Sequence, residues 1–269
     1  MSRHRFFLTD ALPHAAEGEA FVLPLSVGDL HHAGSVLRVR SGEEIDVVEP
    51  SGRVVRVTVE AVRADELLAH GATEIHLDST PHPRLTLAFG VSKGSKNDEI
   101  VEGAVEVGVT ELLPIITARC VVKLDAEKRQ QRVERWSRVA LAAAKQSKRS
   151  TVPHVDAVCA IHDALPLLAA HDVVLVAWEE ADAACSGLRS VIARAMADAN
   201  LAEATESRPV RVALVVGPEG GLTAEEVGAL GAIGARTVTL GTTILRAETA
   251  AVVASALAIH ELGGLGNSR

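Results

Sequence analysis

Two glycine-containing loops in the C-terminal third carry residue types that a binding or catalytic site needs. In "LVVGPEGGLTAEE" (214–226), β-branched residues run into Gly217, then Gly220 and Gly221, and then a helix start. Glycine at such a turn permits positive φ and lets a ligand approach the backbone. The pattern is neither the G-x-G-x-x-G of dinucleotide folds nor a phosphate loop ending in G-K-[ST]. Taken alone, it fits a ligand site and a plain strand–helix turn about equally.

The second loop, "VTLGTTILRAETAA" (238–251), again runs from a strand through Gly241 into a helix. Arg246 and Glu248 lie at or near the helix start, with Thr249 beside them. An arginine in a first helical turn opposes the helix dipole, which suggests that Arg246 serves another purpose. The alternative is a surface arginine paired with Glu248.

The region from Arg119 to Arg149 is strongly basic although the net charge of the chain is -8. It holds ten Lys or Arg and three acidic residues, whereas the rest of the chain holds 17 Lys or Arg and 32 acidic residues. On a helix the region would carry two stripes. The basic stripe is Lys128, Arg132, Arg135, Arg138, Lys145 and Arg149, and the opposing apolar stripe is Val133, Trp136, Ala140 and Ala143. Because three acids allow little pairing within the helix, an anion-binding face is favoured over a solvated one.

Two further groups of cations have weaker patterns. Arg3 and Arg5 stand beside two phenylalanines, as in an RNA-contacting strand or a charged edge strand. Lys93 and Lys96 lie between a strand and a helix, where a phosphate could bind.

The elements that must position these residues fall into two parts. Residues 1–77 read as short strands and turns, with a hairpin at 50–52, and predict a small β-barrel or sandwich. Residues 78–84, with two prolines, predict a linker. Residues 85–269 alternate solidly apolar strands with helices, which predicts a parallel sheet covered on both faces. The expected strands are 85–91, 111–117, 172–178, 210–216 and 236–240, with helices at 96–108, 126–146, 186–199, 223–234 and 247–263. Val212–Val216 thus leads into the glycine loop, and Thr223 with Glu226 predicts a capping box.

Composition excludes several classes of protein. Aromatic residues make up 2% of the chain and tyrosine is missing, so stacking platforms for single-stranded bases are largely ruled out. Cys120, Cys159 and Cys185 are far apart, which argues against a zinc site or disulfide framework and fits a reducing compartment. Without a signal peptide or a membrane-length apolar run, we expect a cytoplasmic protein with no membrane partner and no metal.

Taken together, the motifs resemble the 16S ribosomal RNA (uracil-N3) methyltransferase family, within the SPOUT superfamily of trefoil-knot methyltransferases. The resemblance covers nearly the whole chain in order and rests on these segments: "HAGSVLRVRSGE" (32–43), "ARCVVKLD" (118–125), "KQSKR" (145–149), "VGPEGGLTAEE" (216–226) and "LGTTILRAETAA" (240–251). The glycine loop and the L-G-x-x-I-L-R-x-E-T-A loop are specific only in combination.

The resemblance implies an α/β fold with a mostly parallel sheet and a deep trefoil knot at 85–269, and a PUA-like β-barrel for RNA docking at 1–77. It also implies a homodimer and S-adenosylmethionine as cofactor, with S-adenosylhomocysteine as product. The implied cofactor-binding residues are Trp178, Glu179, Gly217, Pro218, Glu219, Gly220, Gly221, Leu240, Gly241, Ile244, Leu245 and Thr249.

The implied reaction is methylation of uridine N3 in 16S ribosomal RNA, free or in the assembled small subunit. Because N3 carries a proton, transfer needs a base or a stabilised uridylate anion. Arg246 is expected to stabilise charge on the uracil oxygens, and Glu248 or Glu219 to accept the proton or to orient a neighbour. The expected RNA contacts are Arg3, Arg5, Arg38, Lys93, Arg119, Lys123, Gln146 and Arg149.

Two positions depart from the family pattern. Ser35 occupies a position where a basic residue is expected, and Lys148 occupies one where glycine is expected.

There are three alternatives to the uracil-N3 methyltransferase. They are a SPOUT ribose 2′-O-methyltransferase, a non-catalytic RNA-binding assembly factor and a nucleotide-dependent Rossmann enzyme. The glycine loops and Arg246 disfavour the second, and the missing phosphate fingerprint disfavours the third.

Overall fold

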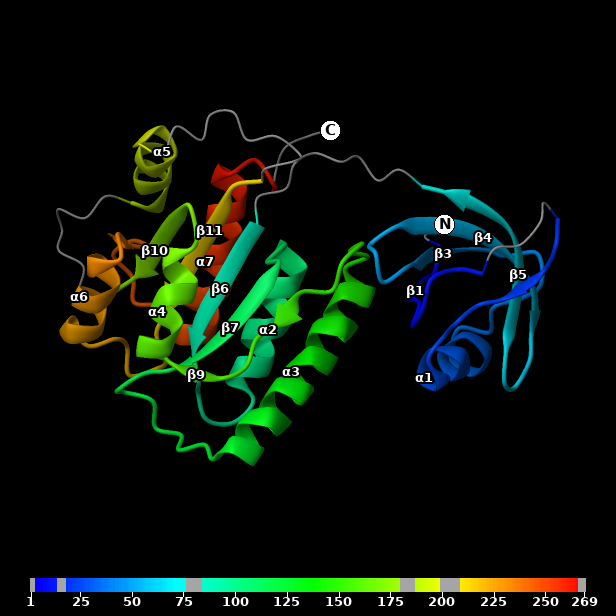
Figure 1. The fold of residues 1–269 in the computed structure, drawn as a ribbon, viewed down its shortest axis with the longest axis horizontal. Coiled ribbons are helices and arrows are strands. Elements are labelled where there is room, and N and C mark those ends of the chain that lie inside the picture. Colours follow the sequence, from blue (N-terminus) through cyan, green and yellow to red (C-terminus); the bar gives the residue numbers. More distant parts are fainter. Residues whose placement is uncertain (1–2, 14–17, 76–83, 180–186, 199–208, 266–269) are drawn as a thin grey trace. The chain divides into compact units, whose positions relative to one another are not determined.

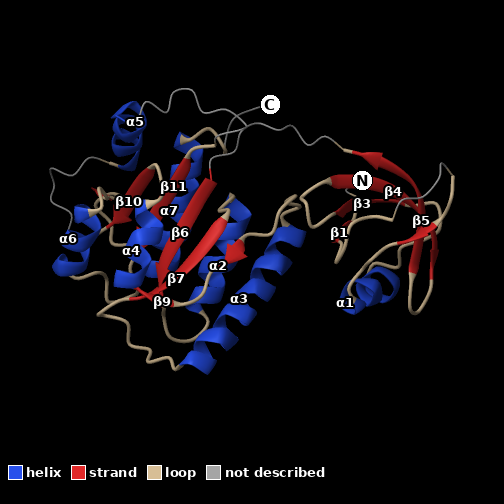
Figure 2. Cartoon of the chain, in the orientation of Figure 1, coloured by secondary structure: helices blue, strands red, loops and turns tan. Residues whose placement is uncertain are grey.

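The computed structural model describes residues 3–13, 18–75, 84–179, 187–198 and 209–265. The chain divides into two compact units (Figures 1 and 2). The first comprises 1–79 together with 145–151, and the second comprises 80–144 and 152–269.

The first unit is built on a five-stranded sheet in the order β1-β3-β4-β5-β2. Its strands are β1 (Arg5–Phe7), β2 (Phe21–Val22), β3 (Glu44–Val48), β4 (Val54–Val62) and β5 (Leu67–Glu74). The predicted hairpin is confirmed, because β3 and β4 pair antiparallel with Val48 opposite Val54. Alternating apolar residues, among them Val47, Val57 and Val59, are fully buried in its core.

A short helical segment in this unit was not predicted. It consists of α1 (Val27–His31), capped by Ser26, and a π-helical turn η1 (His32–Val36). The segment covers part of the "HAGSVLRVRSGE" motif, whose Arg38 follows with a left-handed φ of 53°.

The second unit is an α/β layer structure around a parallel sheet, as predicted. Its strands are β6 (Arg84–Gly90), β7 (Glu111–Ile116), β8 (His154–Val155), β9 (Cys159–Ala160), β10 (Val173–Ala177), β11 (Arg211–Val216) and β12 (Arg236–Val238). The order is β12-β10-β11-β6-β7-β8, with β9 pairing β7 beyond β8. Every pairing is parallel. All five expected strands are confirmed, while the two-residue strands β8 and β9 were not foreseen.

Helices cover both faces of this sheet (Figure 2). They are α2 (Lys96–Val107), α3 (Ala126–Gln146), α4 (Ile161–Ala169), α5 (Leu188–Asp198), α6 (Ala224–Ala232) and α7 (Ala247–Glu261). On one face α2 and α7 pack together, with α7 against β6 and β11. On the other, α4 and α6 pack with residues such as Ala213 and Val215. Among the described helices, none combines the length and apolar character needed to cross a membrane.

Two boundaries differ from the prediction. Arg84, assigned to the linker, is the first residue of β6, and the remainder of the linker, like Cys185, lies outside the described residues. Residues 145–151, assigned to the methyltransferase domain, belong to the first unit. Contacts within that unit explain this: Arg5 donates a hydrogen bond to the Lys148 carbonyl, and Lys145 pairs with the buried Asp29.

Candidate functional site

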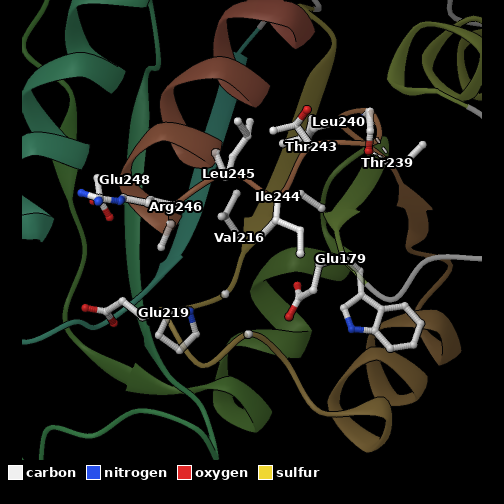
Figure 3. A pocket seen from close by; sticks show the side chains of 18 of the residues that line it. Glu179, Val216, Glu219, Thr239, Leu240, Thr243, Ile244, Leu245, Arg246 and Glu248 are labelled. Carbon is white, nitrogen blue, oxygen red and sulfur yellow. Dashed lines mark hydrogen bonds between the residues drawn. The ribbon is translucent and has the colours of Figure 1, made fainter.

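A cavity of about 460 Å³ opens at the carboxyl ends of β10, β11 and β12 (Figure 3). In open parallel sheets this edge is where ligands bind, and the volume lies in the range of small-molecule sites. Its lining combines the three loops that follow these strands with the start of α7 and one residue of α2. The polar lining side chains are Lys96, Trp178, Glu179, Glu219, Thr239, Thr242, Thr243, Arg246 and Glu248.

The loop after β11 is fixed by the predicted capping box, which is confirmed. The Thr223 hydroxyl accepts from the Glu226 N–H at 3.2 Å, and the Glu226 carboxylate accepts from the Thr223 N–H at 2.9 Å. The other oxygen of Glu226 accepts from the Ala118 N–H at 2.7 Å. This buried carboxylate therefore joins the glycine loop to the "ARCVVKLD" segment.

The glycines of this loop make room for protein neighbours. Gly221 has a φ of 71°, and a Cβ there would lie 2.0 Å from Oε1 of Glu179. A Cβ on Gly220 would lie 2.9 Å from the Cβ of Arg119. The sequence predicted that these glycines contact the cofactor. Gly220 and Thr249 lie outside the cavity lining, and the other predicted cofactor-binding residues all line it.

Gly90 is a determinant of the site that sequence reasoning missed. It ends β6, and a Cβ on it would lie 2.2 Å from the backbone nitrogen of Pro218. The loop after β11 therefore sits directly on the end of β6. A glycine ending the apolar run "LTLAFG" was the available signal.

Arg246 is the N-cap of α7, with φ -65° and ψ 153°, so it precedes the first turn in which it was predicted. Its side chain is exposed. Within the described part of the chain it forms no ion pair, so the alternative of a surface arginine paired with Glu248 is wrong. A free guanidinium at the rim of a cavity can bind an anionic or carbonyl oxygen.

Two carboxylates at this end of the cavity have different surroundings (Figure 3). Oε2 of Glu248 is buried and has no hydrogen-bond partner within the described residues. Glu219 accepts from Nζ of Lys96 at 3.0 Å. Burial alone would raise the pKa of Glu219, but hydrogen bonds from its own N–H and from Ser92, together with the Lys96 ammonium, lower it.

The indole Nε1 of Trp178 is also buried, and no described residue gives it a hydrogen-bond partner. Buried donors and acceptors normally find partners. An unpaired N–H and an unpaired carboxylate oxygen on one cavity therefore fit a ligand that offers both an acceptor and a donor.

The predicted RNA contacts divide into exposed and structural residues. Arg38, Lys93, Arg119, Lys123 and Gln146 are exposed, and Arg119 also donates to the Gly220 carbonyl at 3.1 Å. Arg3 pairs with Glu44 at 2.8 Å. Arg5 is about 10% exposed and pairs with Asp46, so its role in the first unit is structural. Arg149 is partly buried, and this burial lowers its pKa to about 10.

The basic stripe of α3 is more neutralised than its sequence suggested. The prediction considered only acids within 119–149, whereas some of these cations pair with acids elsewhere in the chain. Arg135 pairs with Asp98 and Lys145 with Asp29. Arg132 donates to the Ser92 carbonyl and lies 5.8 Å from the Trp136 ring centroid. The predicted apolar stripe is confirmed for Trp136, Ala140 and Ala143, which are buried.

Residues 79–259 match the family described as an RNA methyltransferase domain. The chain is 32% identical over 252 residues to the ribosomal RNA small subunit methyltransferase E of Mycobacterium bovis, covering 92% of this chain and 88% of that protein. It is 29% identical over 238 residues to the protein of that name from Bacillus subtilis, covering 88% and 89%.

A solved structure shares the fold over almost the whole chain. It is a ribosomal RNA small subunit methyltransferase E from Neisseria gonorrhoeae, bound to S-adenosyl methionine, with 28% identity and a TM-score of 0.75. The match covers 95% of this chain and 96% of that one.

Proposed function

The chain belongs to the ribosomal RNA small subunit methyltransferase E family, and we propose that it transfers a methyl group from S-adenosylmethionine to N3 of a uridine in 16S ribosomal RNA. One observation carries the proposal. Within one turn of α7 the cavity holds an arginine and a buried carboxylate oxygen that have no partner in the described part of the chain, facing the glycine loop. An imide such as uracil, with N–H between two carbonyls, offers the complementary groups.

The cavity suits S-adenosylmethionine, the ligand of the Neisseria gonorrhoeae relative. We assign its binding to the backbone of 217–219, Gly221 and 240–245, and to Trp178. The Nε1–H of Trp178 has no partner among the described residues and can donate to a ligand acceptor. The bound cofactor supplies an electrophilic methyl group on a positively charged sulfur and becomes S-adenosylhomocysteine.

The side chains of α7 supply what the uridine needs. N3 is a poor nucleophile until its proton leaves, and the resulting charge spreads onto the two uracil oxygens. Arg246, exposed and without an ion pair within the described residues, can donate to one of those oxygens. Donors directed at developing charge are usually the largest contribution to such catalysis. Glu219 or Glu248 accepts the proton.

Exposed cations would hold the RNA, because phosphate contacts position a nucleic acid without reading its sequence. Arg38, Lys93, Arg119 and Lys123 are exposed and suited to this role. On the family resemblance we further propose the trefoil knot, a PUA-like first unit, a homodimer and a cytoplasmic location.

The experiment is methyl transfer from labelled S-adenosylmethionine to small ribosomal subunits, and to free 16S RNA, from a strain lacking this gene. Digestion to nucleosides and mass spectrometry then identify the product. Label in 3-methyluridine supports the proposal. Label in a ribose-methylated nucleoside contradicts the N3 assignment, and absence of cofactor binding by calorimetry would favour a non-catalytic assembly factor.

A further inference from the structure

Three glutamates line the cavity, and the two on the side of Arg246, Glu219 and Glu248, could accept the N3 proton (Figure 3). Their environments separate them. Resting on the proposed function, we infer that Glu248 is the proton acceptor, and that Lys96 holds Glu219 in a different role, as a tether of the cofactor-binding loop. Sequence motifs treat the two carboxylates alike and leave Lys96 among possible phosphate contacts.

Lys96 reaches Glu219 because the loop before it is fixed. The Asn97 side chain is fully buried; its carbonyl accepts from the Ser92 N–H at 2.7 Å and its amide donates to the Gly90 carbonyl at 3.1 Å. Arg132 donates to the Ser92 carbonyl. Lys96 is the first residue of α2, so this closed loop fixes the backbone position from which its side chain reaches Glu219.

Glu219 is brought to the same place by Gly90. The missing Cβ of Gly90 allows the backbone at Pro218 to lie against the end of β6. The 3.0 Å Lys96–Glu219 pair then ties the loop after β11 to the start of α2. The lowered pKa of Glu219 also makes it a weak base, because proton affinity falls with pKa.

Glu248 has the opposite character. Oε2 of Glu248 is buried on the cavity wall without a donor among the described residues, so it has a lone pair available for a ligand N–H. Arg246, two residues earlier, borders the same cavity, so proton removal and stabilisation of the anion can occur together.

The step balances with these groups. The N3–H bond breaks and its proton moves to Glu248 Oε2, forming a carboxylic acid. The N3 electron pair bonds to the methyl carbon. The electron pair of the broken sulfur–methyl bond remains on sulfur, and Glu248 later loses its proton to water.

The test separates turnover from cofactor binding in purified full-length protein, with 16S RNA as substrate and S-adenosylhomocysteine as the calorimetric probe. Glu248→Gln should lower kcat by ~100-fold or more, the usual range for a general base. It should leave affinity for S-adenosylhomocysteine unchanged. Glu219→Gln should retain most of kcat and weaken S-adenosylhomocysteine binding.

Lys96 is tested by rescue and by coupling. Lys96→Met should weaken S-adenosylhomocysteine binding, and Lys96→Arg should restore it. A Lys96→Met/Glu219→Gln double variant should bind no worse than either single variant, since both remove one interaction. Glu225→Gln, an exposed carboxylate in the first turn of α6, is the matched control and should change neither kcat nor binding.

Near-normal turnover in Glu248→Gln overturns the inference, as does a kcat loss in Glu219→Gln equal to that in Glu248→Gln. Additive effects of the Lys96 and Glu219 variants would overturn the tether. If the wild-type protein produces no 3-methyluridine while it binds S-adenosylhomocysteine, the proposed function fails first.

Discussion

Arg246 occupies a helix position where serine, threonine, aspartate or asparagine is normally found. It caps α7 with extended backbone but makes no side-chain cap hydrogen bond. A good N-cap residue stabilises a helix by about 0.5–2 kcal/mol. The start of α7 is therefore less stable than it would be with a good N-cap residue, and the position instead places a guanidinium at the cavity.

We predict that Arg246→Ser raises the free energy of unfolding by about 1 kcal/mol and abolishes methylation. Thermal unfolding and the 3-methyluridine assay measure the two effects. Arg246→Ala should be equally inactive without the gain in stability. Near-normal turnover in either variant would contradict the role of Arg246.

Lys148 is held in the left-handed region, with a φ of 57°. This explains why the family resemblance leads one to expect glycine there. Lys148→Gly should stabilise the protein by about 1 kcal/mol, because the left-handed conformation is unfavourable for residues with a Cβ. Denaturant unfolding measures it, and Lys148→Ala, which keeps the Cβ, should show no such gain. Equal stability of both variants would contradict the strain.

At the scale of elements, the hairpin of β3 and β4 carries a carboxylate that should govern acid stability. Glu49 is buried and accepts from Nε and Nη2 of Arg53, each at 2.9 Å, and from the Leu12 N–H at 3.1 Å. The Arg53 hydrogen bonds lower the pKa of Glu49 despite its burial.

Because the folded pKa lies below the unfolded one, this stabilisation is present at neutral pH and is lost as pH falls through the folded pKa. Glu49→Gln should lower Tm at neutral pH and reduce the further loss of Tm on acidification. Calorimetric Tm values across that pH range measure it. A Tm that falls with acid as steeply as in the wild type would show that Glu49 is not the responsible group.

The contact between β6 and the loop after β11 depends on a missing side chain. Gly90→Ala places a Cβ 2.2 Å from the Pro218 nitrogen, so backbone must move. It should lower stability by roughly 1–3 kcal/mol, as overpacking does, and weaken S-adenosylhomocysteine binding. Gly231→Ala in α6 is the control: a Cβ there meets nothing within 4 Å and should stabilise the helix by up to ~1 kcal/mol. Unfolding and calorimetry of both variants decide the matter.

Elements with strong periodicity were predictable and short or locally irregular ones were not. The α3 bounds follow from its two stripes, and β10 and β11 from their solid apolar runs. The α4 helix was missed because Pro166 lies inside it. Within the site, motif residues identified most of the lining, but Gly90 and Lys96 gain their roles only from packing between segments far apart in the chain.

At the scale of the whole molecule, the net charge of -8 requires that RNA binding depend on a few local cations. Lys145 and Arg149 were the natural choices from sequence, but Lys145 pairs with Asp29 and Arg149 is partly buried. Reversing those charges would damage the first unit. Lys123 is exposed and has no ion pair among the described residues, so it isolates the electrostatic effect.

Lys123→Glu should weaken RNA binding and reduce the slope of log K against log salt by about one. Fluorescence anisotropy with a 16S RNA fragment over a series of salt concentrations measures it. Arg194→Glu, an exposed position on α5 with the same change of charge, should have no effect on the slope. An equal change in both variants would point to net charge alone.

Residues 145–151 belong to the first unit although they follow most of α3 in the chain, and this affects how the unit forms during translation. Arg5 and its partner Lys148 are 143 positions apart in the chain. A ribosome therefore exposes β1 to β5 long before it exposes the segment that completes their unit. During translation Arg5 and Asp29 therefore lack these partners until residues 145–148 have emerged. Completion of the first unit thus waits for elongation past α3, and we expect the nascent chain to gain protease resistance there only once that segment has emerged.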